Sequence, residues 1–201
     1  MSLPSCRGLW VASALALGQL GLCSVPDVAQ AADLGPHTYP APSGRLFGNE
    51  FRIGAGIHDI ETHETGASVS GEFLSRWAAL SFNFPGLDTP AALRPTVGGH
   101  LSLEGKTSYV FAGYTLSIEL LAGFFMEGRF GGMLHNGELD SHKDDRVNLG
   151  CPVLFNEAFA MGYRFNDRWN MTTSLEHSSN AGICQPNNGL TNVNMRLGYM
   201  F

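Results

Sequence analysis

The sequence predicts an all-β protein whose strands close into an eight-stranded antiparallel transmembrane β-barrel of the outer-membrane type. Apolar and polar residues alternate with a period of two from Phe47 onward, as expected for strands with two unlike faces. The alternating segments are roughly 10 residues long, which suits a tilted strand that crosses a bilayer. The connections are alternately short and long, and the last strand ends on an aromatic residue, Phe201.

Residues 1–31 differ from the rest of the chain and predict a cleaved secretory signal peptide. An apolar run precedes the small-residue site Ala29-Gln30-Ala31, after which cleavage is expected. The sequence before Cys23 faintly resembles a lipoprotein signal, but the bulky residue next to this cysteine disfavours that alternative. Residues 32–46 lack periodicity and predict an extended N-terminal segment, so the barrel is expected to occupy residues 47–201.

The composition excludes several classes of protein. A formal net charge of -6 and only 15% charged residues argue against nucleic-acid binding, which requires a basic surface. The 25 glycines follow no strict period, which excludes a collagen and a coiled coil. No apolar run after residue 35 is long enough for a transmembrane helix. The chain of 201 residues is therefore expected to form one barrel domain behind its N-terminal segments.

The first half of the barrel contains the less regular strands. Turn residues separate them at Pro85–Pro90 and at Glu104–Lys106. In chain order, the expected segments are 51–58, a weaker stretch at 69–75 followed by 80–84, then 95–103, 109–113 and 120–130. A charged stretch without periodicity at residues 131–150 then predicts a long loop.

The second half of the barrel alternates more strongly. Strands are expected at residues 153–165 and 169–179, joined by a tight turn, and the last strand at residues 192–201. Aromatic residues near the strand ends on the apolar face indicate contact with the membrane interfaces. A soluble barrel or sandwich would place its apolar face inward and charges outward. Here the polar face is mainly small and uncharged, which favours a packed lumen and disfavours a pore.

The predicted loop at residues 131–150 contains several side chains that bind divalent ions in other proteins. They are His135, Asp140, His142, Asp144 and Asp145. Their spacing matches no specific metal site, so a solvated run of charges is the favoured interpretation. We therefore expect neither a bound metal nor a cofactor.

His177 and Ser179 lie two residues apart, so both side chains leave the same face of the strand 169–179. A base beside a hydroxyl is the minimum requirement for a serine hydrolase. If both ends of the barrel lie in the periplasm, this strand runs outward and the pair faces lipid in the outer leaflet. The simpler alternative is a polar strand end, but unpaired polar groups are costly at that depth.

These residues belong to a longer motif with a family resemblance. The run His177–Ala181, followed by Pro186-Asn187 and Gly189, resembles the C-terminal signature of the lipid A 3-O-deacylases. The resemblance covers about residues 150–201. It implies a serine ester hydrolase, built on an outer-membrane barrel of a Gram-negative bacterium, that removes the 3-position acyl chain from lipid A.

The resemblance also implies roles for individual residues. His177 corresponds to the general base and Ser179 to the nucleophile, while Asn180 and Asn187 correspond to residues that bind the oxyanion or the substrate. The implied partners are lipopolysaccharide and the lipids of the outer membrane, with no nucleic acid. Whether the protein forms a homodimer is left open.

One position departs from the family pattern. The acid that completes the family's triad, a glutamate on the last strand, corresponds to Thr191 here. A threonine cannot orient an imidazolium ion by charge. Three interpretations follow: a Ser-His dyad, a substitute acid from elsewhere, or an inactive barrel with a structural or surface-recognition role.

Glu157 is the candidate for a substitute acid. If the strands 153–165 and 169–179 pair across their tight turn, Glu157 lies directly opposite His177 on the same face. It either orients His177 or lies in the headgroup region without a catalytic role. Glu176 is expected to point into the lumen and to pair there with Arg196.

The same register places Cys151 near Cys184. These are the two cysteines that remain after removal of the signal peptide, so an oxidising compartment permits one disulfide between them. The alternative is a pair of free, buried thiols. We expect the disulfide, which would tie the predicted long loop to the segment after residue 180 and stabilise the fold by about 3–4 kcal/mol.

Overall fold

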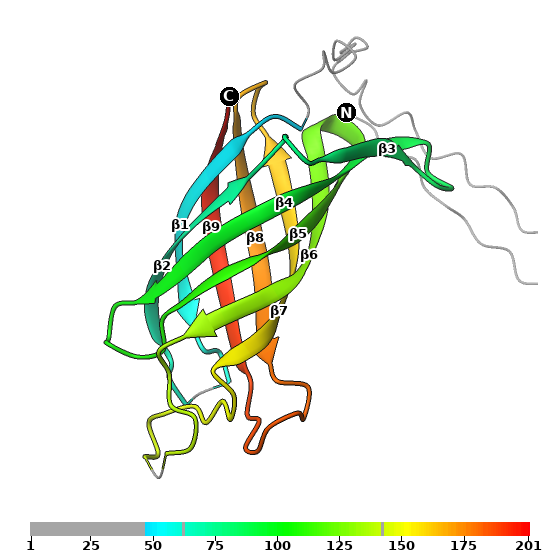
Figure 1. Ribbon diagram of the computed structural model, residues 1–201. Coiled ribbons are helices and arrows are strands. Elements are labelled where there is room, and N and C mark those ends of the chain that lie inside the picture. Colours follow the sequence, from blue (N-terminus) through cyan, green and yellow to red (C-terminus); the bar gives the residue numbers. More distant parts are fainter. Residues whose placement is uncertain (1–46, 62, 142) are drawn as a thin grey trace, which may run out of the picture. The chain divides into compact units, whose positions relative to one another are not determined.

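The computed structural model describes residues 47–61, 63–141 and 143–201 (Figure 1). The predicted signal peptide and extended N-terminal segment therefore lie outside the described residues. In chain order the elements are β1 (Glu50–His58), β2 (Gly66–Leu74), β3 (Leu80–Phe84), β4 (Thr89–Ser102), β5 (Tyr109–Glu119), the 3₁₀ helix η1 (Leu121–Gly123), β6 (Phe124–His135), β7 (Val153–Arg164), β8 (Trp169–Ser179) and β9 (Leu190–Met200). No helix in these three ranges could cross a bilayer.

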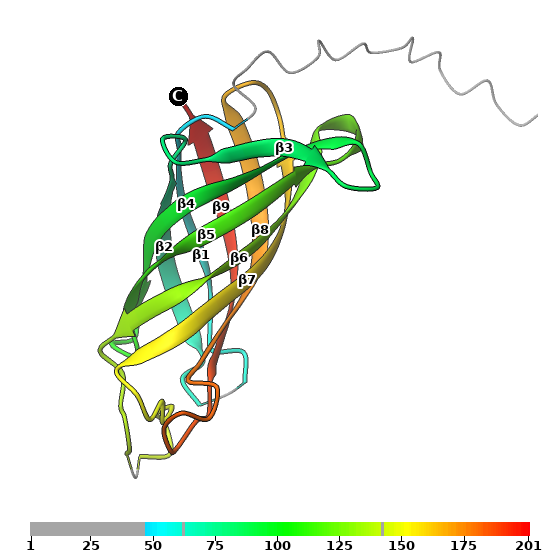
Figure 2. The same cartoon turned by 45° about the vertical axis from the view of Figure 1, so that its right-hand side comes forward.

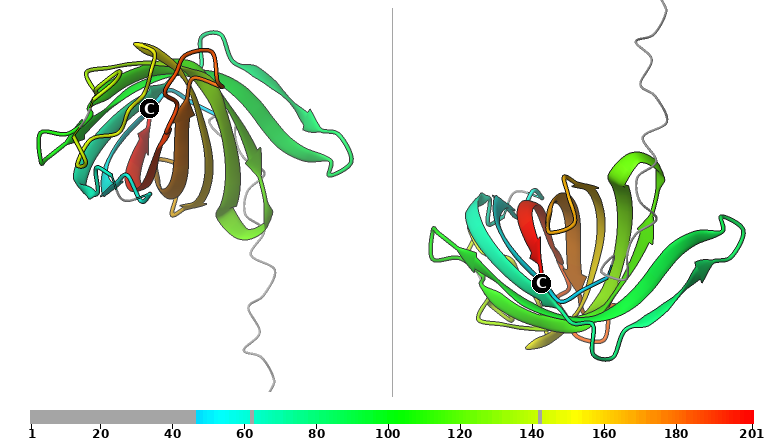
Figure 3. Two further views of the ribbon diagram at one scale, coloured as in Figure 1. Left: turned by 90° about the horizontal axis from the view of Figure 1, so that it is seen from below. Right: turned by 90° about the horizontal axis from the view of Figure 1, so that it is seen from above.

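Eight of the strands close into an antiparallel barrel, which confirms the predicted fold. The order around the barrel is β2-β1-β9-β8-β7-β6-β5-β4, and the pairing of β2 with β4 completes the ring. Closure matters because an unpaired strand edge in hydrocarbon would leave backbone polar groups without partners. Strand β3 pairs only with the start of β4, and this hairpin projects from the barrel wall (Figure 3).

Several strand boundaries differ from the prediction: β5 continues to Glu119 and not only to residue 113, and β6 begins at Phe124 and not at residue 120. Strand β4 begins at Thr89 and not at residue 95, because its first residues form the hairpin with β3. Strand β6 continues to His135, so the first part of the predicted loop 131–150 is a strand. A side chain at Gly131 would place its Cβ 2.2 Å from the carbonyl oxygen of Ala112 on β5. Glycine allows this close approach, and its missing side chain also hides the alternation in the sequence.

The two ends of the barrel are unlike (Figure 2). The C-terminus lies at the end where β5 joins β6 and β7 joins β8 through short connections. The opposite end, called the loop end below, carries the segments 59–65, 103–108, 136–152 and 180–189. Strand β8 therefore runs toward the loop end, and its last residues lie beside these four segments.

The barrel is apolar on its outer face and polar in its lumen. Phe130 is 60% exposed and Phe159 is 51% exposed, whereas Asn156 and Ser178 on neighbouring strands are buried. This distribution is the reverse of that in a soluble barrel. It is the distribution that a barrel in contact with lipid requires.

The lumen is filled by buried ion pairs. Arg52 binds the carboxylates of Glu50 at 2.6 Å, Glu72 at 3.1 Å and Glu127 at 2.5 Å. Glu176 binds Arg196, as predicted, and also Arg129. The network consists of Glu50, Arg52, Glu72, Arg94, Glu127, Arg129, Glu176 and Arg196. Its four carboxylates and four guanidinium groups balance in charge, which is the condition for burying so many ions together.

A single carboxylate, that of Glu64, ties three of the loop segments together. It accepts hydrogen bonds from the backbone N–H groups of Thr107 at 2.7 Å and Val147 at 3.1 Å, and it contacts His58 Nε2 at 3.3 Å. Burial by itself would raise the pKa of Glu64. The hydrogen bonds with His58, Thr107 and Val147 outweigh burial and lower this pKa to about 2. The ionised form of Glu64 therefore holds the loop end in place.

Replacing Arg52 with methionine is expected to destabilise the barrel by about 3–5 kcal/mol, because buried carboxylates lose their countercharge. Arg76 is exposed in the connection after β2, so Arg76→Met should change the free energy of unfolding by no more than about 0.5 kcal/mol. Urea unfolding in lipid vesicles, followed by the gel mobility of the folded barrel, measures both effects. Equal stability of the two variants would contradict the expected contribution of the lumen ion pairs to the free energy of unfolding.

The pH dependence of stability is expected to change in Glu64→Gln. Because the folded pKa of Glu64 lies below its ordinary value of 4.5, ionised Glu64 stabilises the fold above pH 4.5. This contribution, about 3 kcal/mol, is lost as the pH falls from 4.5 toward 2. The unfolding free energy of the variant should therefore fall less steeply over this interval than that of the wild type. Parallel curves for the two proteins would show that Glu64 does not anchor the loops.

Candidate active site

His177 and Ser179 lie at the loop end of β8, and both side chains point outward. Their neighbours Glu176 and Ser178 are buried in the lumen, so strand alternation turns the pair toward the outer face. Both side chains are half-buried. In the part of the chain that the structure describes, no hydrogen bond joins them. Hydrogen bonds between a nucleophile and its base are often long without substrate and shorten when substrate binds.

The imidazole of His177 is held on one side by the last strand. Its Nδ1 atom lies 2.8 Å from the hydroxyl oxygen of Thr191, the residue opposite His177 in the pairing of β8 with β9. The Thr191 hydroxyl in turn donates a hydrogen bond to the carboxylate of Glu61 at 2.6 Å. The carboxylate of Glu61 is therefore linked to the His177 ring through the hydroxyl group of Thr191.

Sequence reasoning missed Glu61. It lies in the segment 59–65, where neither alternation nor a motif marks it, and it is separated from Thr191 by 130 positions in the chain. The two meet because β1 pairs with β9 when the barrel closes. The one signal that could have found it is the pairing of the first strand with the last, which any closed up-and-down barrel requires.

Gly189 forms the other wall of the imidazole site. Its φ of +75° is a backbone conformation that side chains disfavour. A Cβ atom at this position would lie 2.9 Å from Cε1 and 3.4 Å from Nε2 of His177. The absence of a side chain therefore leaves room for the ring between the 180–189 segment and Thr191.

Glu157 lies opposite His177 in the pairing of β7 with β8, which is the predicted register. Its side chain is exposed on the outer face, and among the described residues it forms no hydrogen bond with His177. Both residues border an open groove of about 700 Å³ on the barrel wall. The rest of its lining is mainly apolar: Leu93, Tyr114, Leu116, Gly128, Arg129, Phe130, Ala158, Phe159 and Leu175.

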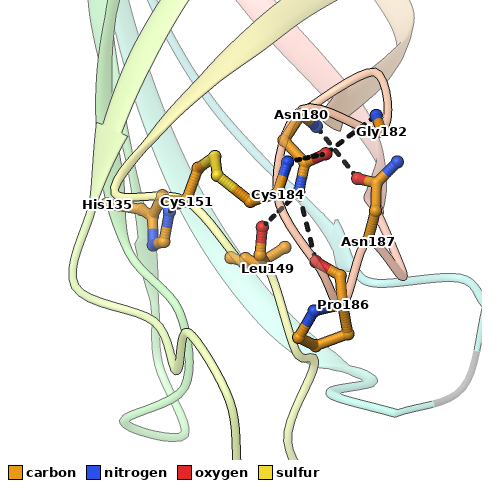
Figure 4. The surroundings of a disulfide bond; sticks show 8 residues. All are labelled: His135, Leu149, Cys151, Asn180, Gly182, Cys184, Pro186 and Asn187. Carbon is orange, nitrogen blue, oxygen red and sulfur yellow. Dashed lines mark hydrogen bonds between the residues drawn. A yellow bond between two sulfur atoms is a disulfide. The ribbon is translucent and has the colours of Figure 1, made fainter.

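Asn180 organises the segment that follows β8 (Figure 4). Its amide nitrogen donates to the carbonyl groups of Leu149 at 3.0 Å and Pro186 at 3.1 Å, and its amide oxygen accepts from the N–H of Gly182 at 2.8 Å. The backbone N–H of Asn180 donates to the amide oxygen of Asn187 at 2.9 Å. The side-chain donors of Asn180 are thus in use. For the amide nitrogen of Asn187, the described residues offer no hydrogen-bond partner.

The predicted disulfide between Cys151 and Cys184 is present (Figure 4). The two Cα atoms are 5.7 Å apart, and the bridge links segment 136–152 to segment 180–189. Cys151 belongs to a buried apolar cluster that includes Leu149, and Cys184 packs against this cluster. The covalent link and the hydrogen bond from Asn180 to Leu149 hold the two segments at a fixed distance beside the end of β8.

Those possible ion-binding side chains of the predicted loop 131–150 that the structure describes do not come together as a site. His135 bonds to the carbonyl oxygen of Cys151 at 2.7 Å, and Asp145 pairs with Lys106 at 2.8 Å. His142 lies outside the described residues. Within the described ranges, no group of three or more histidine, cysteine, aspartate or glutamate side chains could hold a metal ion.

The family described as "Lipid A 3-O-deacylase (PagL)" matches residues 46–200. The chain belongs to this family. A crystal structure of the outer membrane enzyme PagL is similar in fold: it is 17% identical, the match covers 75% of this chain and 99% of that chain, and the TM-score is 0.63. No curated protein matches the sequence.

Two further solved structures are more distant. Neisserial surface protein A (NspA) has a TM-score of 0.48 and 5% identity, over 75% of this chain and 94% of that chain. The outer membrane protein Ail of Yersinia pestis has a TM-score of 0.40 and 10% identity, over 76% and 99% of the two chains. Membership of the PagL family and the barrel fold locate this protein in the outer membrane.

Gly189→Ala is expected to lower deacylation on the order of 10–100-fold, because a Cβ atom would displace the His177 ring by a fraction of an ångström. Gly182→Ala is the matched control. Gly182 also has a positive φ, of +80°, but a Cβ there would meet no atom within 4 Å. Release of the acyl chain from lipid A in outer-membrane preparations measures both variants. An equal loss of activity in both would show that backbone strain, and not contact with His177, is responsible.

Proposed function

We propose that this PagL-family lipid A deacylase hydrolyses the ester at the 3-position of lipid A, with Ser179 as the nucleophile and His177 as the general base. The observation that carries the proposal is the pair of side chains on the outer face of β8, of which His177 borders a groove with mainly apolar walls. A lipid ester has its carbonyl at the membrane interface and its acyl chain in the hydrocarbon. The pair and the groove match these two parts of the substrate.

The proposed reaction follows the chemistry of a serine esterase. His177 Nε2 accepts the proton of the Ser179 hydroxyl as Oγ attacks the ester carbonyl carbon. The tetrahedral intermediate then releases the sugar hydroxyl, which takes the proton from His177, and leaves an acyl group on Ser179. Water, deprotonated by His177, attacks the carbonyl carbon of this acyl-enzyme; the bond to Ser179 Oγ breaks, Oγ takes the proton back from His177, and the fatty acid is released.

The two asparagines are assigned different roles. We assign the oxyanion to the amide nitrogen of Asn187, since its amide oxygen is already anchored by the backbone N–H of Asn180. Asn180 positions that amide, because its own donors bind Leu149 and Pro186. A direct role of Asn180 as an oxyanion donor would require these hydrogen bonds to break. The catalytic role of Glu157 stays a prediction.

Mass spectrometry of lipid A tests the proposed function. Expression of the wild type in Gram-negative cells should remove one 3-hydroxyacyl chain, and fragment ions should assign the loss to the 3-position. Ser179→Ala should reduce the loss on the order of 10³-fold or more, because the variant lacks the proposed nucleophile.

A folding control completes this experiment. Heat-dependent gel mobility should show equal amounts of folded barrel for the wild type and Ser179→Ala. If the folded wild-type barrel leaves lipid A unchanged, the competing interpretation of an inactive barrel is correct. If Ser179→Ala stays as active as the wild type, the nucleophile is another residue.

A further inference from the structure

The hydroxyl of Thr191 lies between the base His177 and the carboxylate of Glu61, at 2.8 Å and 2.6 Å respectively. We propose that Glu61, acting through the Thr191 hydroxyl, is the positioning acid of this site. The proposal rests on the proposed function, since it assigns Glu61 a role in the deacylation that His177 and Ser179 perform. In this role Glu61 contacts neither substrate nor reacting atoms and acts only through Thr191.

The direction of the hydrogen bonds follows from the chemistry of the three groups. A carboxylate can only accept, so the single proton of the Thr191 hydroxyl points to Glu61. The hydroxyl oxygen must then accept a proton from His177, which places the N–H of the neutral ring on Nδ1. Nε2 is left with a free lone pair. This is the tautomer that a general base for Ser179 requires.

The segment that carries Glu61 is built to hold it against β9. The backbone N–H of Ile60 donates to the carbonyl oxygen of Thr191 at 2.8 Å. Asp59 is buried and has a φ of +46°, and its carboxylate accepts the N–H groups of Glu61 at 3.2 Å and Glu64 at 2.6 Å. The backbone N–H of Asp59 donates a hydrogen bond to the side-chain oxygen of Asn192 at 2.9 Å. The segment that leads to Glu61 is therefore anchored to the carbonyl group of Thr191 and to the side chain of Asn192 on β9.

Glu157 is the other acid near His177, and the geometry favours Glu61 over it. In the neutral ring, the only proton of His177 is the one that Nδ1 donates to Thr191. Glu157 lies across the strand pair on the outer face and has no hydrogen bond to the ring. A carboxylate there could stabilise the imidazolium ion only through space. Glu61 can do so through two consecutive hydrogen bonds.

The effect of Glu61 should be smaller than that of an acid bonded directly to the base. Removal of a directly bonded acid from a serine triad lowers kcat by about 10⁴-fold. Glu61 is one hydroxyl farther away and its side chain is exposed, so its charge is weaker at the ring. We therefore expect losses on the order of 10–100-fold in kcat, with KM unchanged because neither Glu61 nor Thr191 touches the substrate in this proposal.

A double-mutant cycle on the full-length protein in outer membranes tests the proposal. Glu61→Gln and Thr191→Val should each lower kcat, and the double variant should be no slower than the slower single variant, because the residues act as one unit. Thr191→Ser should retain activity. Glu61→Gln combined with Thr191→Glu should recover activity, since the new carboxylate can reach Nδ1 directly. Glu138→Gln is the matched control and should behave like the wild type, because Glu138 is a partly exposed acid in segment 136–152 that pairs with Lys143.

The outcomes separate this inference from the proposed function. If the wild type deacylates lipid A and Ser179→Ala does not, but Glu61→Gln matches the wild type, the role of Glu61 is refuted and the function stands. Additive losses in the cycle, or no recovery with Thr191→Glu, also refute it. If Glu157→Gln lowers kcat and Glu61→Gln does not, the acid is Glu157. An inactive, folded wild type removes both proposals.

Discussion

The balanced ion network in the lumen is the constraint on which the rest of this structure depends. Arg52 and its partners can be buried only because every charge has a countercharge within reach, and because the closed strand ladder keeps the backbone satisfied. Because the charged side chains occupy the lumen, the neighbouring apolar side chains of each strand point outward. The same alternation turns His177 and Ser179 toward the lipid, since their neighbours Glu176 and Ser178 belong to the lumen.

The proposed hydrolytic site lies on the outer wall of the barrel, where it needs more support than the strand itself provides. Three independent restraints meet around His177 and the end of β8: the Thr191 hydroxyl, the bare backbone of Gly189 and the disulfide between Cys151 and Cys184. Asn180 adds the hydrogen bonds that shape the segment between them. Such restraints favour one orientation of the ring, as the proposed role of His177 as a general base requires.

Much of this arrangement could be predicted from local pattern. The regular strands β7 and β8 allowed a register to be counted from their tight turn, and that register paired Glu157 with His177 and predicted the disulfide. Prediction failed where glycine interrupts the alternation, at Gly131, and where a hairpin lies outside the barrel, before residue 95. At Gly131 there is no side chain to show the alternation. Before residue 95, the first residues of β4 pair with β3, which lies outside the barrel.

The sequence by itself determined the two faces of each regular strand, the His177 and Ser179 pair, the partner of Glu176 and the cysteine bridge. Each of these follows from the period of two along a strand or from pairing across one turn. Only the tertiary structure decided which acid accepts a hydrogen bond from Thr191. Glu61 and Thr191 are 130 positions apart and meet where β1 pairs with β9, an arrangement that exists only once the barrel has closed. No local pattern carries that information, because the side chain comes from an irregular segment whose position is set by backbone hydrogen bonds around Asp59.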